Sequence, residues 1–480
     1  MVVNLANSKT SQLFNLITDK LKEYIKDIRG IRKKGSFAQN FAFVFTGNAF
    51  FIIIQFVAAP ILSRIYTPEA YGLFGIFNAI ITNVVMVSTL MYPNALILPT
   101  SNRKFMHMIH LILFLVFLTS FASLIFVIFL GEFTLRILNA EGMNFFIYLI
   151  PIGILVFGIN QVTSQWIVRL KAFKENMQIG STAFAFIKGM TILYGIATNG
   201  AVNGITLFAI AGKLLGSIVQ FFLIIKQFFF EKWELPRFHN MREIALEYLR
   251  FPKLVLPGNY LNLLSGQLPI YFLSFYFGSS VLGLFAFATS LLDMPMRLLG
   301  NAVSPVFYQK ANELQNTKPS ELPHVTYRLY NRLLFLGIIP FSFVTIFGDL
   351  IFNVIFGSQW TQAGLFAGYM SVYYLFRLIS GPLTSIFNVL RKESLLFRFQ
   401  LVLILTRFMA LLVGVYVFKN EETTILLFGI FSSLAYILLN GMVFHVLNIN
   451  PIKIIAKSFM YVAISLFLLF FLRFLLFLII

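Results

Sequence analysis

Long apolar runs separated by short polar breaks fill most of the chain. A helix needs about 20 apolar residues to cross the hydrocarbon core of a bilayer. By that measure the pattern predicts twelve core spans and one extra span at the C-terminus. The predicted spans are 41–62, 71–98, 109–130, 145–168, 179–198, 204–225, 254–277, 281–306, 329–356, 363–390, 397–418, 424–445 and 459–480.

Lysine and arginine are unevenly distributed among the polar breaks. They gather in every second break, and the breaks between hold only Arg64, Arg136 and Lys419. Cytoplasmic loops of membrane proteins carry an excess of these residues. The alternation therefore predicts a cytoplasmic N-terminus, and thirteen spans would leave the C-terminus on the far side. The basic breaks are 103–104, 169–174, 226–253, 310–332, 391–398 and 453–457.

The segment 1–40 precedes the first predicted span and combines eight lysines and arginines with apolar residues at helical spacing. It lacks the short apolar core of a cleavable signal peptide, so the first span is expected to serve as the signal. The pattern predicts an amphipathic helix lying on the cytoplasmic leaflet, held by its apolar stripe and by anionic lipids. A docking site for a partner is the alternative.

Composition supports a polytopic membrane protein. Of the 480 residues, 59% are hydrophobic and 11% are charged, whereas a soluble domain carries about 25% charged residues. The net charge of +19 is expected from cytoplasmic loops, so no nucleic-acid partner is predicted. The absence of cysteine excludes disulfides, thiolate metal sites and cysteine nucleophiles.

An internal repeat divides the predicted spans into two halves. Shifting the sequence by 211 residues places Ser63 on Ser274, Gly47-Asn48 on Gly258-Asn259, and Gly72-Leu73-Phe74 on Gly283-Leu284-Phe285. The repeat predicts two pseudo-symmetric six-helix lobes around a central cationic cavity, related by an axis along the membrane normal. The expected domains are an N-lobe (41–226), a cytoplasmic linker (227–253), a C-lobe (254–447) and an additional helix (448–480).

Motifs of enzymes are missing from the chain. It has no phosphate-binding loop of the Gly-x-x-x-x-Gly-Lys-Ser/Thr type, no Gly-x-Ser-x-Gly elbow and no His-Glu-x-x-His helix. We therefore predict that the protein is not an enzyme and holds no catalytic residues, metal or cofactor.

Charged residues inside the predicted spans are the first candidates for a binding site. Such groups are costly in the bilayer and usually face a bundle interior or a watery cavity. Six of the eight are cationic, which favours an anionic ligand, and arginine and lysine together suit a pyrophosphate. The eight are Lys188, Lys213, Asp293, Arg297, Asp349, Arg377, Arg407 and Arg473.

We predict pyrophosphate binding by Lys213, Arg297 and Arg377, with Lys188 and Arg407 as lesser candidates. Other roles stay open for several of these charges. Asp293 and Arg297, four residues apart on one helix, could neutralise each other. Arg473 is expected to reach the membrane surface from a helix end, and Lys188 and Arg407 could also reach an interface.

Amide side chains and helix breaks mark the first predicted span of each half. Proline frees backbone carbonyls and permits bending, so these helices could act as gates. The amides either contact glycan hydroxyls or bond neighbouring helices. They are Asn48 and Gln55 beside Pro60 in the first copy, and Asn259, Asn262 and Gln267 beside Pro257 and Pro269 in the second.

Residues 60–74, Pro-Ile-Leu-Ser-Arg-Ile-Tyr-Thr-Pro-Glu-Ala-Tyr-Gly-Leu-Phe, begin the next helix, with Thr67 as the expected N-cap and Pro68 at the first helical position. This stretch closely resembles the pattern after the first helix of bacterial polysaccharide transporters, the lipid-linked oligosaccharide flippases. Residues 92–99, 264–269 and 295–307 resemble further segments of that family. At 92–99 the family's usual arginine and acidic residue are replaced, by Tyr92 and by Asn94 or Ala95.

The resemblance covers about residues 41–390 and implies two six-helix lobes around a central cavity. It also implies a function: alternating access that moves an undecaprenyl-pyrophosphate-linked oligosaccharide from the cytoplasmic to the periplasmic leaflet of the bacterial inner membrane. The product would serve surface polysaccharide of the O-antigen or capsule type. The implied partners are the lipid-linked substrate, membrane lipids, and a polysaccharide polymerase with its chain-length machinery.

Two other functions remain open from the residues. A multidrug antiporter of the same superfamily needs a membrane carboxylate for a cationic drug and a coupling ion, but the first six spans contain none and the second half has Asp293 and Asp349. A polysaccharide polymerase usually displays a large periplasmic loop, whereas the longest far-side break is 131–144.

Overall fold

The computed structural model describes residues 37–227 and 236–479. The basic segment predicted at 1–40 therefore lies almost wholly outside the described residues. Within them all regular secondary structure is helical, without a β-strand. Ten of the described helices are long and apolar enough to cross a membrane, which makes this a multi-pass membrane protein.

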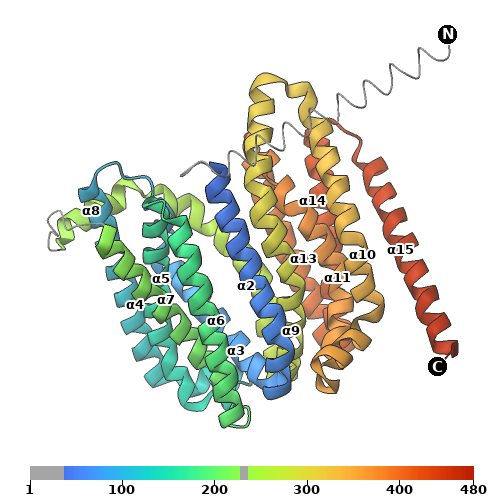
Figure 1. Cartoon of the computed structure of the whole chain (residues 1–480), viewed down its shortest axis with the longest axis horizontal. Coiled ribbons are helices and arrows are strands. Elements are labelled where there is room, and N and C mark those ends of the chain that lie inside the picture. The colour runs from blue at the N-terminus through green and yellow to red at the C-terminus, as the bar shows by residue number, and fades with distance from the viewer. Residues whose placement is uncertain (1–36, 228–235, 480) are drawn as a thin grey trace.

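The first helices form one bundle, the N-lobe (Figure 1). They are α2 (Phe37–Ile65), α3 (Pro68–Thr89), η1 (Tyr92–Ala95), α4 (Asn102–Ile137), η2 (Glu141–Tyr148), α5 (Leu149–Arg169), α6 (Phe173–Ala197) and α7 (Gly204–Gln227). The second predicted span was too long. It ends at Thr89 because Leu90 and Met91 adopt positive φ angles of 50° and 62°, which stop the helix before the short turn η1.

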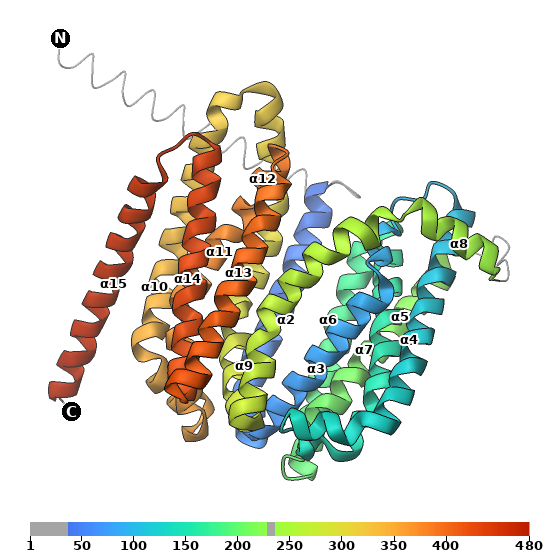
Figure 2. The ribbon, with the colours of Figure 1, turned by 180° about the vertical axis from the view of Figure 1, so that it is seen from behind.

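The later helices form the C-lobe, with α15 at its outer edge beside α10 (Figure 2). They are η3 (Phe251–Val255), α9 (Leu256–Thr317), η4 (Pro319–Glu321), α10 (Leu322–Phe356), η5 (Ser358–Trp360), α11 (Thr361–Leu383), α12 (Ser385–Val389), α13 (Glu393–Val413), η6 (Gly414–Phe418), α14 (Glu421–Val446) and α15 (Pro451–Ile479). Helix α8 (Phe238–Glu247), which precedes them, lies on the N-lobe beside α4 (Figure 1).

Helix α9 contains two predicted spans in a single run of 62 residues. Gly278 breaks the run with φ 86° and ψ 173°, a conformation that L side chains rarely adopt. The chain reverses there, and its two arms are the seventh and eighth predicted spans. Residues 227–253, expected to be only a linker, include the helix α8, which packs on α4 and forms a Lys104–Glu247 ion pair of 2.8 Å.

The two lobes touch at one end, here called the closed end, and diverge toward the end that carries α8, here called the linker end (Figures 1 and 2). Gly72 of α3 and Gly283 of α9 meet at the closed end. A Cβ added to Gly72 would lie 1.8 Å from the Ser279 carbonyl oxygen, and one added to Gly283 would lie 1.7 Å from the Pro68 carbonyl oxygen.

These contacts confirm the internal repeat. Gly283 and Ser279 follow Gly72 and Pro68 by the same 211 residues. Exchanging the two halves therefore converts the Gly72–Ser279 contact into the Gly283–Pro68 contact. Such reciprocal contacts are typical of a two-fold axis. Ser63 and Ser274, also related by the shift, each donate to a backbone carbonyl of the opposite lobe, that of Phe356 and that of Leu138.

Local signals also hold near this axis. The Thr67 hydroxyl accepts from the Ala70 amide, with Pro68 at the first helical position, so the predicted N-cap of α3 is confirmed. Trp360 is fully buried at the closed end, where its indole nitrogen donates to the Ser63 carbonyl at 2.8 Å. Its ring packs against Tyr71 of α3, with ring centroids 5.1 Å apart.

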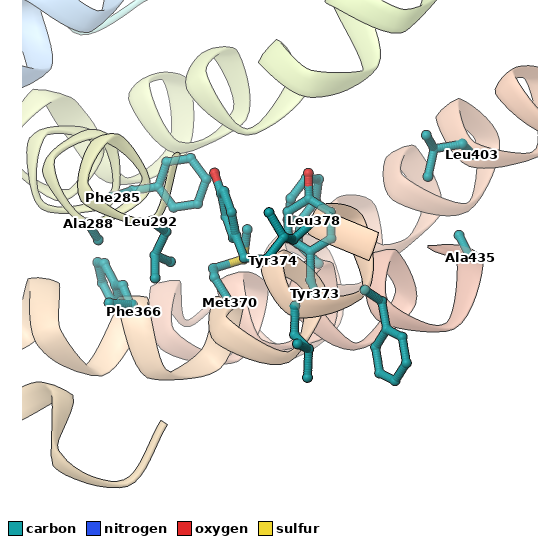
Figure 3. Close-up of a cluster of buried hydrophobic side chains, with 14 of the residues drawn as sticks. Phe285, Ala288, Leu292, Phe366, Met370, Tyr373, Tyr374, Leu378, Leu403 and Ala435 are labelled. Atoms are coloured by element: carbon teal, nitrogen blue, oxygen red, sulfur yellow. The ribbon is translucent and has the colours of Figure 1, made fainter. Parts of the chain in front are cut away.

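Helix α11 is the centre of the C-lobe core. Sixteen of its residues are buried, because α9, α10 and α14 surround it. In Figure 3 its Phe366, Met370 and Tyr374 lie toward Leu292 and its neighbours on α9. The rigid core fixes where α11 holds its one charged side chain, Arg377.

Candidate functional site

Two lysines place positive charge in the N-lobe. Lys213 on α7 is exposed, and its ammonium donates to Asn160 Oδ1 on α5 at 3.3 Å. Lys188 on α6 is half-buried, with its ammonium 5.5 Å from the Phe184 ring centroid. Neither lysine forms an ion pair within the described residues, so both charges are available to an anion.

The C-lobe arginines differ sharply from one another. Arg377 on α11 pairs with Asp293 on α9, N to O 3.0 Å, and both side chains keep about a third of their surface exposed, 33% and 29%. Arg297, one turn beyond Asp293, is exposed and has no ion pair among the residues described. The sequence left open whether Asp293 neutralises Arg297 on the same helix. In the structure Asp293 on α9 instead forms its ion pair with Arg377 on α11.

Arg407 does not face open space in this conformation. It is 2% exposed, and it donates from Nε to Ser432 and from a terminal nitrogen to Ser265, both at 3.0 Å. Its guanidinium also lies 5.2 Å from the Tyr373 ring centroid and 5.1 Å from that of Phe428. These contacts join α9, α11, α13 and α14, so Arg407 is a cross-link inside the C-lobe.

Arg473 was expected to reach the membrane surface, and the structure shows that it is held in an ion pair. Its guanidinium forms a fork with Asp349 on α10, with N to O distances of 3.0 and 2.6 Å, and also donates to the Ile346 carbonyl. A carboxylate on the facing helix neutralises a charge that would be costly in the bilayer. The pair fastens α15 to the C-lobe.

The predicted amides separate into distinct groups. Asn262 and Asn259 are exposed on α9, and Asn259 donates to the carbonyl of Val255, the last residue of η3, at 2.8 Å. Gln55 is half-buried on α2, and the Asn48 side chain lies outside the described residues. Gln267 forms a hydrogen bond with a neighbouring helix, which is the second of the two roles predicted for these amides.

The partner of Gln267 is Asn83 on α3, a residue that the sequence did not single out. The Asn83 amide nitrogen donates to Gln267 Oε1 and to the Tyr271 hydroxyl, the latter at 2.9 Å, across the lobes. Asn83 is 8% exposed, and its own oxygen has no hydrogen-bond partner among the described residues. The sequence could have indicated Asn83 because it is a polar residue within an apolar predicted span. Such a residue is weaker evidence for a functional site than a charged residue in the same position.

Taken together, three partly or fully exposed span cations have no carboxylate partner among the described residues: Lys188, Lys213 and Arg297. Arg407 also lacks one, but it is only 2% exposed. The two membrane carboxylates, Asp293 and Asp349, are both held in ion pairs. A cationic ligand would find no free carboxylate there, whereas an anion would find three unneutralised charges. The geometry is therefore suited to an anionic ligand.

A family model described as a polysaccharide biosynthesis protein matches residues 61–364. The chain belongs to this family. No curated protein matched its sequence. Its fold is shared by solved structures that are distant in sequence, and they fit the resemblance noted from residues 60–74.

Three of these structures are transport proteins. The lipid II flippase MurJ in an inward closed conformation has 14% identity and a TM-score of 0.63, with 91% of this chain and 100% of that chain covered. An inward-facing multidrug resistance MATE transporter has 12% identity and a TM-score of 0.62, covering 85% and 95%. A MOP superfamily transporter from Pyrococcus furiosus has 14% identity and a TM-score of 0.53, again with 85% of this chain and 95% of that chain covered.

The similarity shows that this polysaccharide biosynthesis family member has the transporter fold of the MurJ and MATE proteins. At these identities it does not distinguish a lipid-linked ligand from a drug. That distinction rests on the charges of this chain.

Proposed function

We propose that the protein is a flippase. It moves an oligosaccharide linked to undecaprenyl pyrophosphate from the cytoplasmic to the periplasmic leaflet of the bacterial inner membrane, for surface polysaccharide synthesis. The observation that carries the proposal is the excess of unpaired cations on the lobes, beside two carboxylates that are already neutralised. Membership of the polysaccharide biosynthesis family supports it.

The pyrophosphate is attracted first by Lys213 and Arg297, which lie on opposite lobes and are exposed. Lys188 adds a third charge. Arg377 joins them when the ligand competes with Asp293, whose side chain is 29% exposed and therefore open to exchange. Arg407 acts indirectly, because it holds the C-lobe helices that carry the other groups.

The remaining parts of the ligand match other features. Glycan hydroxyls contact the exposed amides Asn259 and Asn262 and the half-buried Gln55. Asn48 is assigned the same role. Gln267 with Asn83 forms part of the gate between the lobes. The polyprenyl tail remains in lipid beside the opening, because placing it among polar groups would lose its hydrophobic stabilisation.

The charge distribution supports an orientation of the protein in the membrane. Basic residues gather at the linker end, so that end is cytoplasmic by the positive-inside tendency. The closed end is then periplasmic, and the structure represents the state that loads from the cytoplasm. Separation of the lobes at the Gly72–Gly283 contact releases the ligand on the far side. The flipped unit passes to a polymerase and its chain-length machinery.

The test combines deletion in the host with variants. Deletion should trap complete polyprenyl-linked repeat units on the cytoplasmic leaflet, where mass spectrometry of the extracted lipid also identifies the sugar. Lys213→Met and Arg297→Gln should each reduce export about tenfold or more at unchanged protein abundance, since each removes a charge that binds the ligand. Arg398→Gln, an exposed arginine at the linker end of α13, is the matched control.

Three outcomes contradict the proposal. Normal export by both charge variants refutes the assigned site. Repeat units that still arrive at the periplasmic leaflet after deletion, but remain unpolymerised, indicate a polymerase. Restored drug resistance in a sensitised strain, without any defect in glycan lipids, indicates a multidrug antiporter.

A further inference from the structure

A shallow groove lies on the first turns of α10, at the linker end of the C-lobe. Its volume is about 570 Å³. The extra helix α15 runs beside α10 in both views (Figures 1 and 2). None of the charges assigned above to transport lines it. The lining residues are His324, Tyr327, Arg328, Asn331, Arg332, Phe335 and Leu336.

The groove carries uncompensated positive charge. Arg328 and Arg332 are four residues apart on the same face of α10, and both are exposed. Like charges at this spacing repel each other. Neither has an ion pair in the described part of the chain, since the nearest carboxylate along it, Glu321, pairs with Lys318 at 3.2 Å. An anion at this position would relieve the repulsion.

One arginine is already oriented for such a ligand. A terminal nitrogen of Arg328 donates to His324 Nε2 at 2.8 Å. Because a guanidinium has no acceptor, the imidazole nitrogen must be the acceptor, and the bond fixes the plane of the Arg328 fork. A guanidinium fixed in this way can offer its remaining donors to a phosphate with less loss of side-chain entropy.

Helix α15 packs beside the groove, whose lining residues all belong to α10. Tyr461 packs on Phe335, with ring centroids 5.2 Å apart. The Lys457 ammonium lies 5.6 Å from the Tyr461 ring centroid and is exposed. A third cation thus borders the groove from the neighbouring helix. Basic pockets between transmembrane helices on the cytoplasmic side are typical binding sites for anionic lipid headgroups.

The floor of the groove changes from polar to apolar along α10. Phe335 and Leu336 lie one turn deeper than Arg332 and are 54% and 55% exposed. A soluble anion would use only the basic end. An amphiphile uses both ends, with its phosphate on the arginines and its acyl chains along the exposed aromatic and leucine side chains.

We infer that this groove binds an anionic phospholipid, with Arg328 and Arg332 on the headgroup phosphate and Phe335 and Leu336 against the acyl chains. The juxtaposition of oriented arginines, a bordering lysine and an apolar floor carries the assignment. The inference is independent of the flippase proposal, because it concerns equilibrium binding at a different surface.

Native mass spectrometry of the purified full-length chain tests this assignment. The protein is titrated with phosphatidylglycerol or with phosphatidylcholine of the same acyl chains. Arg328→Gln with Arg332→Gln should weaken phosphatidylglycerol binding about tenfold or more. Arg328→Lys with Arg332→Lys should retain most of it. Arg391→Gln with Lys392→Gln, which removes two exposed charges at the α12–α13 turn, should leave it unchanged.

Several results overturn the inference. Equal phosphatidylglycerol binding by the double glutamine variant removes the arginines from the site. Equal retention of phosphatidylcholine by the unaltered chain means that headgroup charge is not recognised. Displacement of the lipid by millimolar inorganic phosphate assigns the groove to a soluble anion, and displacement by equimolar undecaprenyl phosphate assigns it to the carrier lipid.

Discussion

The contact between Gly72 and Gly283 makes closure of the lobes sensitive to a single methyl group. In the Gly72→Ala variant the new Cβ would lie 1.8 Å from the Ser279 carbonyl oxygen. Carbon and oxygen normally stay at least about 3.3 Å apart. The lobes must therefore separate by roughly 1.5 Å at this point, because the obstacle is backbone and no side chain can rotate away.

The energetic consequence follows from this overlap. Adding a methylene group to a well-packed contact typically costs about 1–3 kcal/mol. If the cost falls only on the closed arrangement, the ratio of closed to open molecules falls about 5-fold to 150-fold. Gly283→Ala should have the same effect. The double variant should add little, because one separation relieves both contacts.

The natural absence of cysteine supplies a clean assay. Ser63→Cys places a thiol at the closed end, where the parent side chain is fully buried and donates to the Phe356 carbonyl. In purified protein, Gly72→Ala should increase the rate of maleimide labelling of this thiol by a similar factor. Ser371→Cys, buried inside the C-lobe, reports general unfolding and should stay slow.

The matched control is Gly75→Ala, one turn along α3. Its new Cβ would meet the Ala286 Cβ at 3.7 Å, an ordinary contact, so its labelling rate should match that of the parent. An unchanged rate in Gly72→Ala, with the protein still folded, would refute the reasoning about closure. Equal acceleration by both alanines would show that any change on α3 loosens the lobes.

Three further predictions concern the ion pairs and the buried guanidinium. Arg407→Ala should lower stability by about 2–5 kcal/mol, and Arg407→Met by clearly less, in thermal unfolding of the purified protein, because methionine retains most of the buried volume; equal losses contradict the packing role. Asp293→Asn should raise the affinity for inorganic pyrophosphate several-fold in calorimetry, since Arg377 loses its competitor; unchanged affinity removes Arg377 from the site. Asp349→Asn should destabilise by about 1–3 kcal/mol and make α15 more accessible to protease, since Arg473 loses its fork; unaltered proteolysis argues against the fastening role.

The sequence determined the features that depend on local or periodic information. Apolar length predicted most of the spans. Thr67 and Pro68 predicted the start of α3, because a cap needs only the adjacent backbone. The 211-residue shift predicted the two-fold relation, since repeated sequence folds into repeated structure, and the reciprocal contacts at Gly72 and Gly283 bear it out.

Only the tertiary structure decided the partners of the charges. Spacing along one helix offered Arg297 to Asp293, yet the helix packing brings Arg377 to it from α11. Arg407 is enclosed by four helices, and Arg473 finds Asp349 on α10, 124 residues earlier in the chain. The physical reason is that an ion pair in a bilayer depends on depth and facing surfaces, which are set by how helices pack and not by their order in the sequence.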